Sequence, residues 1–278
     1  MTKKYIPILT IAGSDSSGGA GIQADIKTMS ALGCYAASAI TSITVQNTTG
    51  VTAVEALRPE IVAGQIKAVM DDIHPKSVKI GMVNDTATIT AIAEELRRHN
   101  EPDYLVIDPV MVSTSGSRLM QEDALETFRR ELMPLATLLT PNIPEAEVLS
   151  GVRISDDTSC DAAARVIAKA MKTGGYMLIK GGHTGGNEKQ DRLYDSSGLF
   201  VTAFTQHAID TCNTHGTGCT LSSAVTCYLA MGMHMEEAIG KAKEYVSMAI
   251  AAGADVSIGG GHGPVNHFFC PEPMRKTR

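Results

Sequence analysis

The chain has 278 residues, of which 44% are hydrophobic, 19% are charged and only 4% are aromatic, with 26 Gly and no Trp. This composition is typical of a globular α/β protein and excludes the disordered and fibrous classes; the length predicts one domain, residues 1–278, with a small lid. The formal net charge of -6, without a cluster of Lys and Arg before the last few residues, excludes nucleic acid and membrane surfaces as expected partners and favours small molecules.

The six cysteines contain no C-x-x-C pair, so the sequence predicts neither a zinc site nor a disulfide framework. The first apolar run is short, contains Pro7 and passes directly into Gly13, which is unlike a signal peptide. No later segment is long and apolar enough to span a bilayer. We therefore expect reduced thiols and a cytoplasmic location.

Short apolar runs alternate with helical patterns along most of the chain. Residues 6–13 predict a buried strand, and residues 19–33 predict a helix with apolar side chains on one face. Further strands are expected at 35–45, 77–83, 104–110, 135–142 and 176–182. Further helices are expected at 59–74, 85–99, 121–133, 143–150 and 158–174.

The last third of the chain breaks this alternation. Two short runs within residues 191–204, around Ser196-Ser197-Gly198, predict a β-hairpin, and two helices follow at 217–231 and 235–252. The overall pattern predicts a mainly parallel sheet with helices on both faces. Because ligands of such sheets bind beyond the carboxyl ends of the strands, the polar and Gly-rich clusters that follow the strands are expected to meet at one edge.

The first of these clusters is "GSDSSGGAG", residues 13–21, between a predicted strand and a predicted helix. It matches neither G-x-x-x-x-G-K-[ST] nor G-x-G-x-x-G, so the common nucleotide-binding motifs do not apply. The pattern is compatible with a tight turn or with a ligand-binding loop.

The second cluster is "HGTGCTLSS", residues 215–223, at the start of a predicted helix. Gly216 and Gly218 allow backbone amides to converge, while Thr217 and Cys219 lie in the first helical turn, which together describes an anion-binding site. The alternative is that Gly and Thr only cap the helix and that Cys219 is a small buried side chain.

Three further side chains follow strands. Asp108 in "VIDPV" and Glu145 in "TPNIPEAE" are placed to hold Mg²⁺ through water, although Glu145 is equally placed to cap a helix. Lys180, at the end of "MLIKGGH", either reaches a phosphate or lies in solvent. Together with the predicted anion site, these residues indicate phosphoryl transfer with Mg²⁺.

The histidines show no metal-ligand spacing, so we expect structural or substrate-adjacent roles for four of them. These are His183, His215, His262 and His267.

Eight motifs spread over residues 12–269 resemble one known family. They are "AGSDSSGGAGIQADIKT", "TVQNTTGV", "KIGM", "DPVM", "LLTPNIPEAE", "LIKGGH", "NTHGTGCTLSSA" and "GHGPVNHF". In this order they resemble the hydroxymethylpyrimidine and phosphomethylpyrimidine kinases of thiamin biosynthesis. The resemblance implies a ribokinase-like three-layer α/β/α fold. It also implies ATP-dependent phosphorylation of 4-amino-5-hydroxymethyl-2-methylpyrimidine, and then of its monophosphate to the diphosphate.

The resemblance also implies roles for the residues at the start of the helix. Similar sugar kinases of the ribokinase-like group have an Asp base where this chain has Cys219. A helix N-terminus lowers the pKa of a thiol, so Cys219 is expected to accept the hydroxyl proton as a thiolate. The amides from Gly216 through Gly218 to Cys219 would hold the transferred phosphoryl group.

The substrate and nucleotide pockets follow from the same resemblance. Gln46 would hydrogen-bond the aminopyrimidine edge, because its amide both donates and accepts. Ring-pocket residues would be Gly13, Asp25, Met82 and Val110. Nucleotide and metal residues would be Asn142, Lys180 and Thr217 for ATP, and Asp108 and Glu145 for Mg²⁺.

One residue departs from the pattern, because Val45 precedes Gln46 where this family more often has Ala. If its side chain faces the ring, it narrows the pocket. The resemblance further implies a homodimer, and residues 48–54 and 181–188 are the candidate lids, since Gly and polar residues follow strands there.

Three other functions remain to be weighed against this one. Pyridoxine or pyridoxal kinase is the nearest alternative, because that pyridine carries a comparable hydroxymethyl group, but "TVQNT" and "NTHGTGC" favour the pyrimidine. Cys219 disfavours a ribokinase-type sugar kinase, for which an Asp is required. A catalytically silent protein that senses the pyrimidine is disfavoured because the presumed catalytic positions are all occupied.

Overall fold

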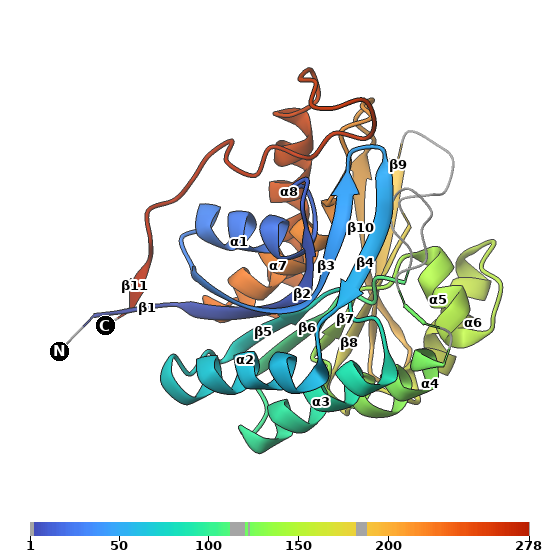
Figure 1. The fold of residues 1–278 in the computed structure, drawn as a ribbon. Helices are drawn as coiled ribbons and strands as arrows, with labels where there is room; N and C mark the ends of the chain where they lie inside the picture. The colour runs from blue at the N-terminus through green and yellow to red at the C-terminus, as the bar shows by residue number, and fades with distance from the viewer. Residues whose placement is uncertain (1–2, 112–119, 122, 182–187, 278) are drawn as a thin grey trace.

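The computed structural model describes residues 3–111, 120–121, 123–181 and 188–277. These residues form a nine-stranded sheet between two layers of helices (Figure 1). The strands are β2 (Pro7–Asp15), β3 (Tyr35–Asn47), β4 (Gly50–Ala56), β5 (Ser77–Ile80), β6 (Tyr104–Ile107), β7 (Leu138–Leu139), β8 (Tyr176–Lys180), β9 (Glu188–Asp195) and β10 (Phe200–His207).

The helices alternate with the strands in the order expected for an α/β fold. They are α1 (Gly21–Ala31), α2 (Pro59–Asp72), α3 (Thr86–Arg98), α4 (Ala124–Thr127), α5 (Ile143–Ser150), α6 (Asp157–Ala168), α7 (Thr217–Ala230) and α8 (Met235–Ala251). Helix α4 continues into the short turns η1 (Phe128–Leu132) and η2 (Met133–Leu135), so the single helix predicted at 121–133 is divided. Near the two ends of the chain, β1 (Lys4–Tyr5) pairs with β11 (Lys276–Thr277).

The strand order is β10-β9-β8-β7-β6-β5-β2-β3-β4. From β8 to β3 every pair is parallel, whereas β4, β9 and β10 join in antiparallel pairs. The predicted hairpin at 191–204 is therefore the β9–β10 pair, and the predicted mainly parallel α/β sheet is confirmed. The carboxyl ends of six parallel strands meet at one edge.

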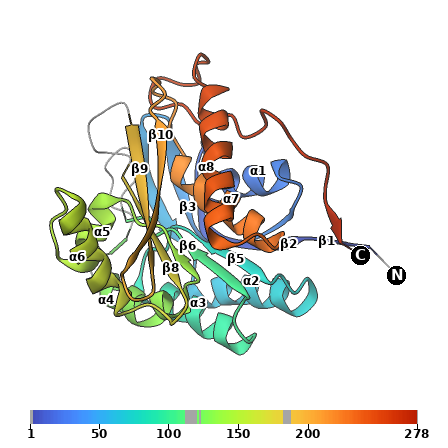
Figure 2. The same ribbon diagram turned by 180° about the vertical axis from the view of Figure 1, so that it is seen from behind.

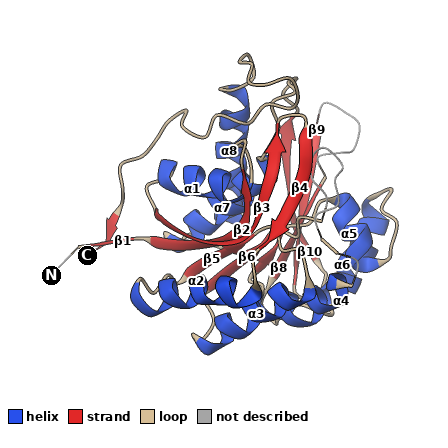
Figure 3. Cartoon of the chain, in the orientation of Figure 1, coloured by secondary structure: helices blue, strands red, loops and turns tan. Residues whose placement is uncertain are grey.

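Alternate strand residues feed two hydrophobic cores, one on each face of the sheet. Leu9 and Ile11 of β2 pack with α2, α3, α5 and α6, whereas Ile8 packs with α1, α7 and α8. Figures 2 and 3 show the two helical layers on opposite sides of the strands. Burial on both faces explains why these strands read as continuous apolar runs.

Strand β4 is the main element that the sequence did not predict. Its residues are all exposed or half-buried. The segment therefore lacks the alternation of apolar and polar residues that would predict a strand. Most residues of the candidate lid at 48–54 belong to this strand. The turn before it is fixed to a distant loop, because His262 N donates to Thr48 O at 2.9 Å and Gly261 N donates to Thr48 Oγ1 at 3.2 Å. The second lid candidate, 181–188, lies mostly outside the described residues, as does His183.

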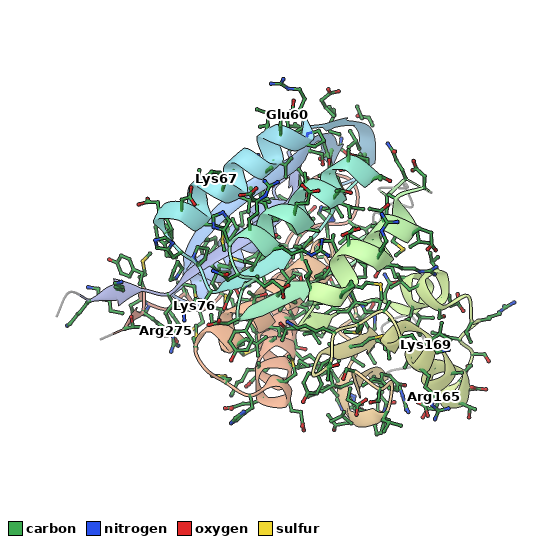
Figure 4. All side chains as sticks on the ribbon, turned by 90° about the horizontal axis from the view of Figure 1, so that it is seen from below. Glu60, Lys67, Lys76, Arg165, Lys169 and Arg275 are labelled. Carbon is green, nitrogen blue, oxygen red and sulfur yellow. The ribbon has the colours of Figure 1, made fainter. Side chains whose placement is uncertain are left out.

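Charged side chains of both signs cover the outer helical layer. Figure 4 shows Glu60 and Lys67 on α2 and Arg165 and Lys169 at α6 on the periphery of the molecule. Within the described part of the chain, no helix is long and apolar enough to cross a membrane.

Candidate active site

A cavity of about 700 Å³ opens at the edge where the parallel strands end. Almost all residues predicted for the site line it. They are Gly13, Gln46, Met82, Asp108, Val110, Asn142, Glu145, Lys180, Gly216, Thr217, Gly218 and Cys219. The exception is Asp25, which lies outside the cavity wall.

The first turn of α7 forms one wall of the cavity. Gly216 precedes the helix with φ +83°, and a Cβ at this position would lie 1.8 Å from the carbonyl oxygen of Gly19 in the other Gly-rich loop. Thr217 donates to Thr214 O through Oγ1 at 2.6 Å and through N at 3.2 Å, and Thr220 N donates to Gly216 O at 2.8 Å. The amides of Gly218 and Cys219 lie between these bonds, in the first turn, where helix amides lack intrahelical partners. The two Gly-rich loops therefore pack backbone against backbone, and a helix N-terminus suited to an anion faces the cavity.

Opposite this helix end lies an ion pair. Lys180 Nζ donates to Asp108 Oδ1 at 2.7 Å, and Thr140 Oγ1 donates to the same oxygen at 3.0 Å. A Cβ on Gly218 would lie 3.3 Å from Asp108 Oδ2 and 3.5 Å from Lys180 Nζ. Gly218 therefore lies within contact distance of both charged groups.

Glu145 has two functions that the sequence left as alternatives. It completes a capping box with Asn142, in which Asn142 N donates to Glu145 Oε2 and Glu145 N donates to Asn142 Oδ1, each at 2.9 Å. It also lines the cavity. Burial, together with the nearby Asp108 and against the attraction of Lys180, raises its pKa to about 7.

Asp108 and Glu145 fit the requirements of a magnesium ion bound with phosphates. Carboxylate oxygens are the ligands Mg²⁺ prefers, and it usually takes one or two of them with water and substrate phosphate. Burial is the main cause of the raised pKa of Glu145, and the charge of Asp108 adds to it; a cation held by both carboxylates would oppose both effects. Among the described residues, no group of three or more His, Cys, Asp or Glu is arranged to hold a metal by protein ligands alone.

The expected low pKa of Cys219 is wrong. Burial raises the pKa of this thiol to about 11, and Asp25 and Asp108 raise it further against the opposing effect of Lys79. Desolvation disfavours the thiolate more than the neighbouring lysine favours it. The thiol is therefore protonated at neutral pH.

Asp25 belongs to a buried network instead of the ring pocket. Its carboxylate accepts two hydrogen bonds of 2.9 Å from Lys79 Nζ, one of 2.6 Å from Thr10 Oγ1 and one of 2.7 Å from Ser223 Oγ. Both charged side chains are fully buried. Lys79 was missed in the sequence because it lies within the strand segment "SVKI"; a lysine inside a buried apolar strand is itself the signal that could have identified it.

Asp15 organises the first Gly-rich loop. Its Oδ1 accepts from Ser17 N at 2.8 Å, and its Oδ2 accepts from Gly19 N at 3.1 Å, Ala20 N at 2.8 Å and His215 Nε2 at 2.8 Å. Burial alone would raise its pKa, but these hydrogen bonds hold the pKa at about 2. The loop is thus a tight turn that also lines the cavity, and His215 connects it to the loop before α7.

The other two described histidines of the predicted group, His262 and His267, do not line the cavity. His267 is buried beside Thr220, and burial lowers its pKa to about 4, whereas His262 is exposed. Both fit the structural reading.

The far end of the cavity is bounded by Gly13, Thr44, Gln46, Met82 and Val110. Ser16 Oγ donates to Gln46 O at 2.7 Å and accepts from Gln46 N at 2.9 Å, which fixes the main chain of Gln46. Val45 does not narrow this space, because its side chain is 58% exposed on the opposite face of β3.

A second lysine was missed from the sequence. Lys243 of α8 is buried, lines the cavity and donates to Asp191 Oδ2 at 2.5 Å. Asp191 also accepts from Gly181 N at 3.0 Å through Oδ1. The sequence did contain an indication of this lysine. It adjoins Ala242 on the face of α8 whose buried residues recur at helical spacing, for example Ala242 and Val246.

Comparison with protein families matches residues 15–266 to the family described as phosphomethylpyrimidine kinase. The chain belongs to this family. A hydroxymethylpyrimidine/phosphomethylpyrimidine kinase of Rhizobium meliloti is 50% identical over 94% of this chain and 96% of its own. A thiamine biosynthesis bifunctional protein of Geobacter sulfurreducens is 45% identical over 96% of this chain, which spans about half of that longer protein (53%).

Solved structures of this family and of a related kinase share the fold. A phosphomethylpyrimidine kinase of Clostridium difficile superposes with a TM-score of 0.76 at 46% identity, over 88% of this chain and 99% of that one. A pyridoxal kinase of Staphylococcus aureus, in complex with AMP-PCP and pyridoxal, superposes with a TM-score of 0.85 at 32% identity, over 95% and 94% of the two chains. The ribokinase-like resemblance and the kinase family predicted from the motifs are confirmed.

Proposed function

We propose that this protein uses ATP to phosphorylate 4-amino-5-hydroxymethyl-2-methylpyrimidine on its hydroxymethyl group, and then phosphorylates the monophosphate to the diphosphate. The observation that carries the proposal is the position of the α7 N-terminus against the Lys180–Asp108 pair, in a cavity that ends at Gln46. The first feature suits a phosphoryl group in transfer and the last suits an aminopyrimidine.

The proposed roles follow from the charges around the cavity. The backbone amides at the helix end, from Gly216 through Thr217 and Gly218 to Cys219, donate hydrogen bonds to the phosphoryl oxygens. Lys180 neutralises charge on the ATP phosphates, with Asn142 beside it, and the second buried lysine, Lys243, adds a positive charge on the α8 side. Phosphoryl transfer requires this positioning and neutralisation more than a strong base.

Mg²⁺ would be held through Asp108 and Glu145. When bound, it would neutralise phosphate charge. Lys180 meanwhile holds Asp108 in position, and the capping box with Asn142 fixes the backbone that carries Glu145.

Product analysis tests the proposal. The protein is incubated with ATP and Mg²⁺ and, in separate reactions, with the hydroxymethylpyrimidine, its monophosphate and pyridoxal. Conversion of both pyrimidines to the next phosphate is the expected result. Absence of any phosphorylated pyrimidine would refute it.

Pyridoxal kinase is the second candidate. It is supported by the Staphylococcus aureus pyridoxal kinase, which matches this fold over nearly the whole chain. Turnover of pyridoxal without turnover of either pyrimidine would establish this alternative.

We further propose a cytoplasmic homodimer. All six cysteines are free, as expected in a reducing compartment. Ile43 and Val45 are exposed on the outer face of the edge strand pair β3–β4, where an apolar face is suited to a second copy.

A further inference from the structure

A buried hydroxyl lies beside the substrate end of the cavity without a hydrogen-bond partner. Ser42 of β3 is fully buried, and its Oγ has no partner among the described residues. Leaving a buried hydroxyl unpaired costs about 1–3 kcal/mol, so native proteins usually provide a partner. The missing partner of Ser42 therefore points to a group that arrives with a ligand.

Gly13 and the end of the Met82 side chain lie between the Ser42 hydroxyl and the cavity. A Cβ built on Gly13 would lie 2.8 Å from Ser42 Oγ and 2.8 Å from Met82 Cε. Both Gly13 and Met82 line the cavity, and no side chain stands on Gly13. The terminal methyl of Met82 is consequently the movable part of the wall beside Ser42.

Met82 can move at its side chain while its backbone stays fixed. Thr41 Oγ1 donates to Met82 O at 2.8 Å, which anchors the main chain. The unbranched thioether has three rotatable bonds and adapts to irregular contacts. A ring that enters the cavity can therefore displace the methyl without disturbing the strand.

Ser42 and Gln46 are placed to contact opposite sides of one ring. They lie four residues apart on β3, and alternate residues of a strand face the same side. Four residues of strand span roughly 13 Å. If Ser42 and Gln46 each make one hydrogen bond of about 2.9 Å to the ring, about 7 Å of this span remains. That length must hold a six-membered ring and the side chain of Gln46.

We propose that Ser42 is a specificity-determining residue whose hydroxyl donates a hydrogen bond to the ring nitrogen on the side opposite Gln46. This inference rests on the proposed function. In the hydroxymethylpyrimidine, one ring nitrogen adjoins the amino-bearing carbon and belongs to the edge assigned to Gln46. The second ring nitrogen has an in-plane lone pair and is left for Ser42.

The test measures kcat/KM for two enzymes, each with two substrates. The enzyme is wild type or Ser42→Ala. The substrate is the hydroxymethylpyrimidine or (2-amino-6-methylpyridin-3-yl)methanol, in which the second ring nitrogen is CH and all other groups are kept. We expect wild type to prefer the pyrimidine in kcat/KM by about tenfold, which is the upper range for one hydrogen bond, and Ser42→Ala to lose that preference.

Thr28→Val is the matched control. Thr28 Oγ1 of α1 is also buried and has no partner in the described part of the chain, but Thr28 does not line the cavity. Both substitutions remove an unpaired hydroxyl, so the melting temperature should stay level or rise in each. Thr28→Val should keep the wild-type preference between the two substrates, and Ser42→Cys, whose slightly larger thiol is a weaker donor, should fall between wild type and Ser42→Ala.

Two outcomes would overturn the inference. The first is a Ser42→Ala enzyme that still discriminates between the substrates as wild type does. The second is an unchanged kcat/KM for the pyrimidine in Ser42→Ala, which would mean that an internal water satisfies the hydroxyl. Failure of wild type to phosphorylate the pyrimidine at all would instead refute the proposed function.

Discussion

Two opposing effects act on the pKa of the Cys219 thiol. It lies in the first turn of α7, where a helix end favours a negative charge, but it is half-buried and lies near Asp25 and Asp108. With the pKa raised to about 11, only about one thiol in 10⁴ is ionised at pH 7. A thiolate base would therefore make the rate increase about tenfold per pH unit from pH 7 to pH 10.

We predict that the hydroxyl proton does not leave through this thiolate. Cys219→Ser should lower kcat by less than about tenfold, because phosphoryl transfer through a loose transition state needs little base. The pH profiles of kcat for wild type and variant should be parallel between pH 7 and pH 9. A steep rise that is present in wild type and absent in Cys219→Ser would restore the thiolate as base.

Glu145 makes the stability of the free protein depend on pH. Burial raises its pKa from the usual 4.5 to about 7 in the fold, so the folded state binds more protons than the unfolded state between these pH values. The contribution to stability is therefore fully present below pH 4.5 and is lost as the pH increases through 7. The loss amounts to at most about 3 kcal/mol.

We predict that Glu145→Gln raises the melting temperature of the nucleotide-free protein by roughly 5 °C at pH 8 and has little effect at pH 5. Gln keeps the oxygen that accepts from Asn142 N. Thermal unfolding at both pH values measures the difference, with Glu55→Gln on the exposed side of β4 as control. Mg²⁺ and ATP should reverse the order, since a cation favours the carboxylate; a lower melting temperature for Glu145→Gln at pH 8 without ligand would contradict the prediction.

At the residue scale, motif positions could be predicted from the sequence but their environments could not. Asp108 and Lys180 followed from their places after strands, and both line the cavity. The error for Cys219 arose because helix position is visible in a sequence, whereas burial and the nearby carboxylates come from distant segments. Asp25 was misplaced for the same reason, since its partner Lys79 is 54 residues away.

Two Gly-rich loops form the functional element of this fold. They contact each other through Gly216 and Gly19 and through the hydrogen bond from His215 to Asp15. Any side chain at Gly216 would meet the Gly19 carbonyl at 1.8 Å and would also strain a backbone with φ +83°. The loops must separate to accept it, which displaces the amides at the start of α7.

We predict that Gly216→Ala lowers kcat/KM by about a hundredfold, the usual effect of a displacement of about 1 Å at a catalytic group. Gly232→Ala is the control, because Gly232 has φ +89° but nothing within 4 Å of its missing Cβ. The control should cost about 1–3 kcal/mol of stability from backbone strain and keep full activity. Steady-state kinetics and thermal unfolding of both variants give the comparison; equal activities would show that contact between the loops is unimportant.

The elements with a buried face could be read from the sequence, and those without one could not. The parallel strands read as continuous apolar runs and the helices repeat apolar residues at helical spacing, so the sequence located them, although α6 ends at Ala168, six residues before the predicted end at 174. β4 has no buried residue, and it is held as a strand by pairing with β3 alone. The helix at 121–133 was divided because Pro134 and the local packing introduce tighter and wider turns that periodicity does not reveal.

On the scale of the whole molecule, the sheet has two different edges. β10 closes one edge through its hairpin with β9, and β4 closes the other through its hairpin with β3 (Figure 1). On β3, Thr44 and Gln46 face the cavity, whereas Ile43 and Val45 face outward and are 43% and 58% exposed. Exposed β-branched side chains on an edge hairpin are a surface that soluble proteins usually cover or charge.

We predict that the protein is a dimer through this outer face, and that Val45→Lys converts it to a monomer by placing a charge in an apolar contact. Light scattering coupled to size-exclusion chromatography, over a range of protein concentrations, measures the mass. Leu199→Lys is the control, since Leu199 is 55% exposed but lies in the β9–β10 turn at the other end of the strand order. A monomeric wild type would contradict the dimer, whereas a Val45→Lys protein that stays dimeric would place the interface elsewhere. Because Val45 points away from the cavity, the monomer should keep the substrate preference of wild type, which separates assembly from catalysis.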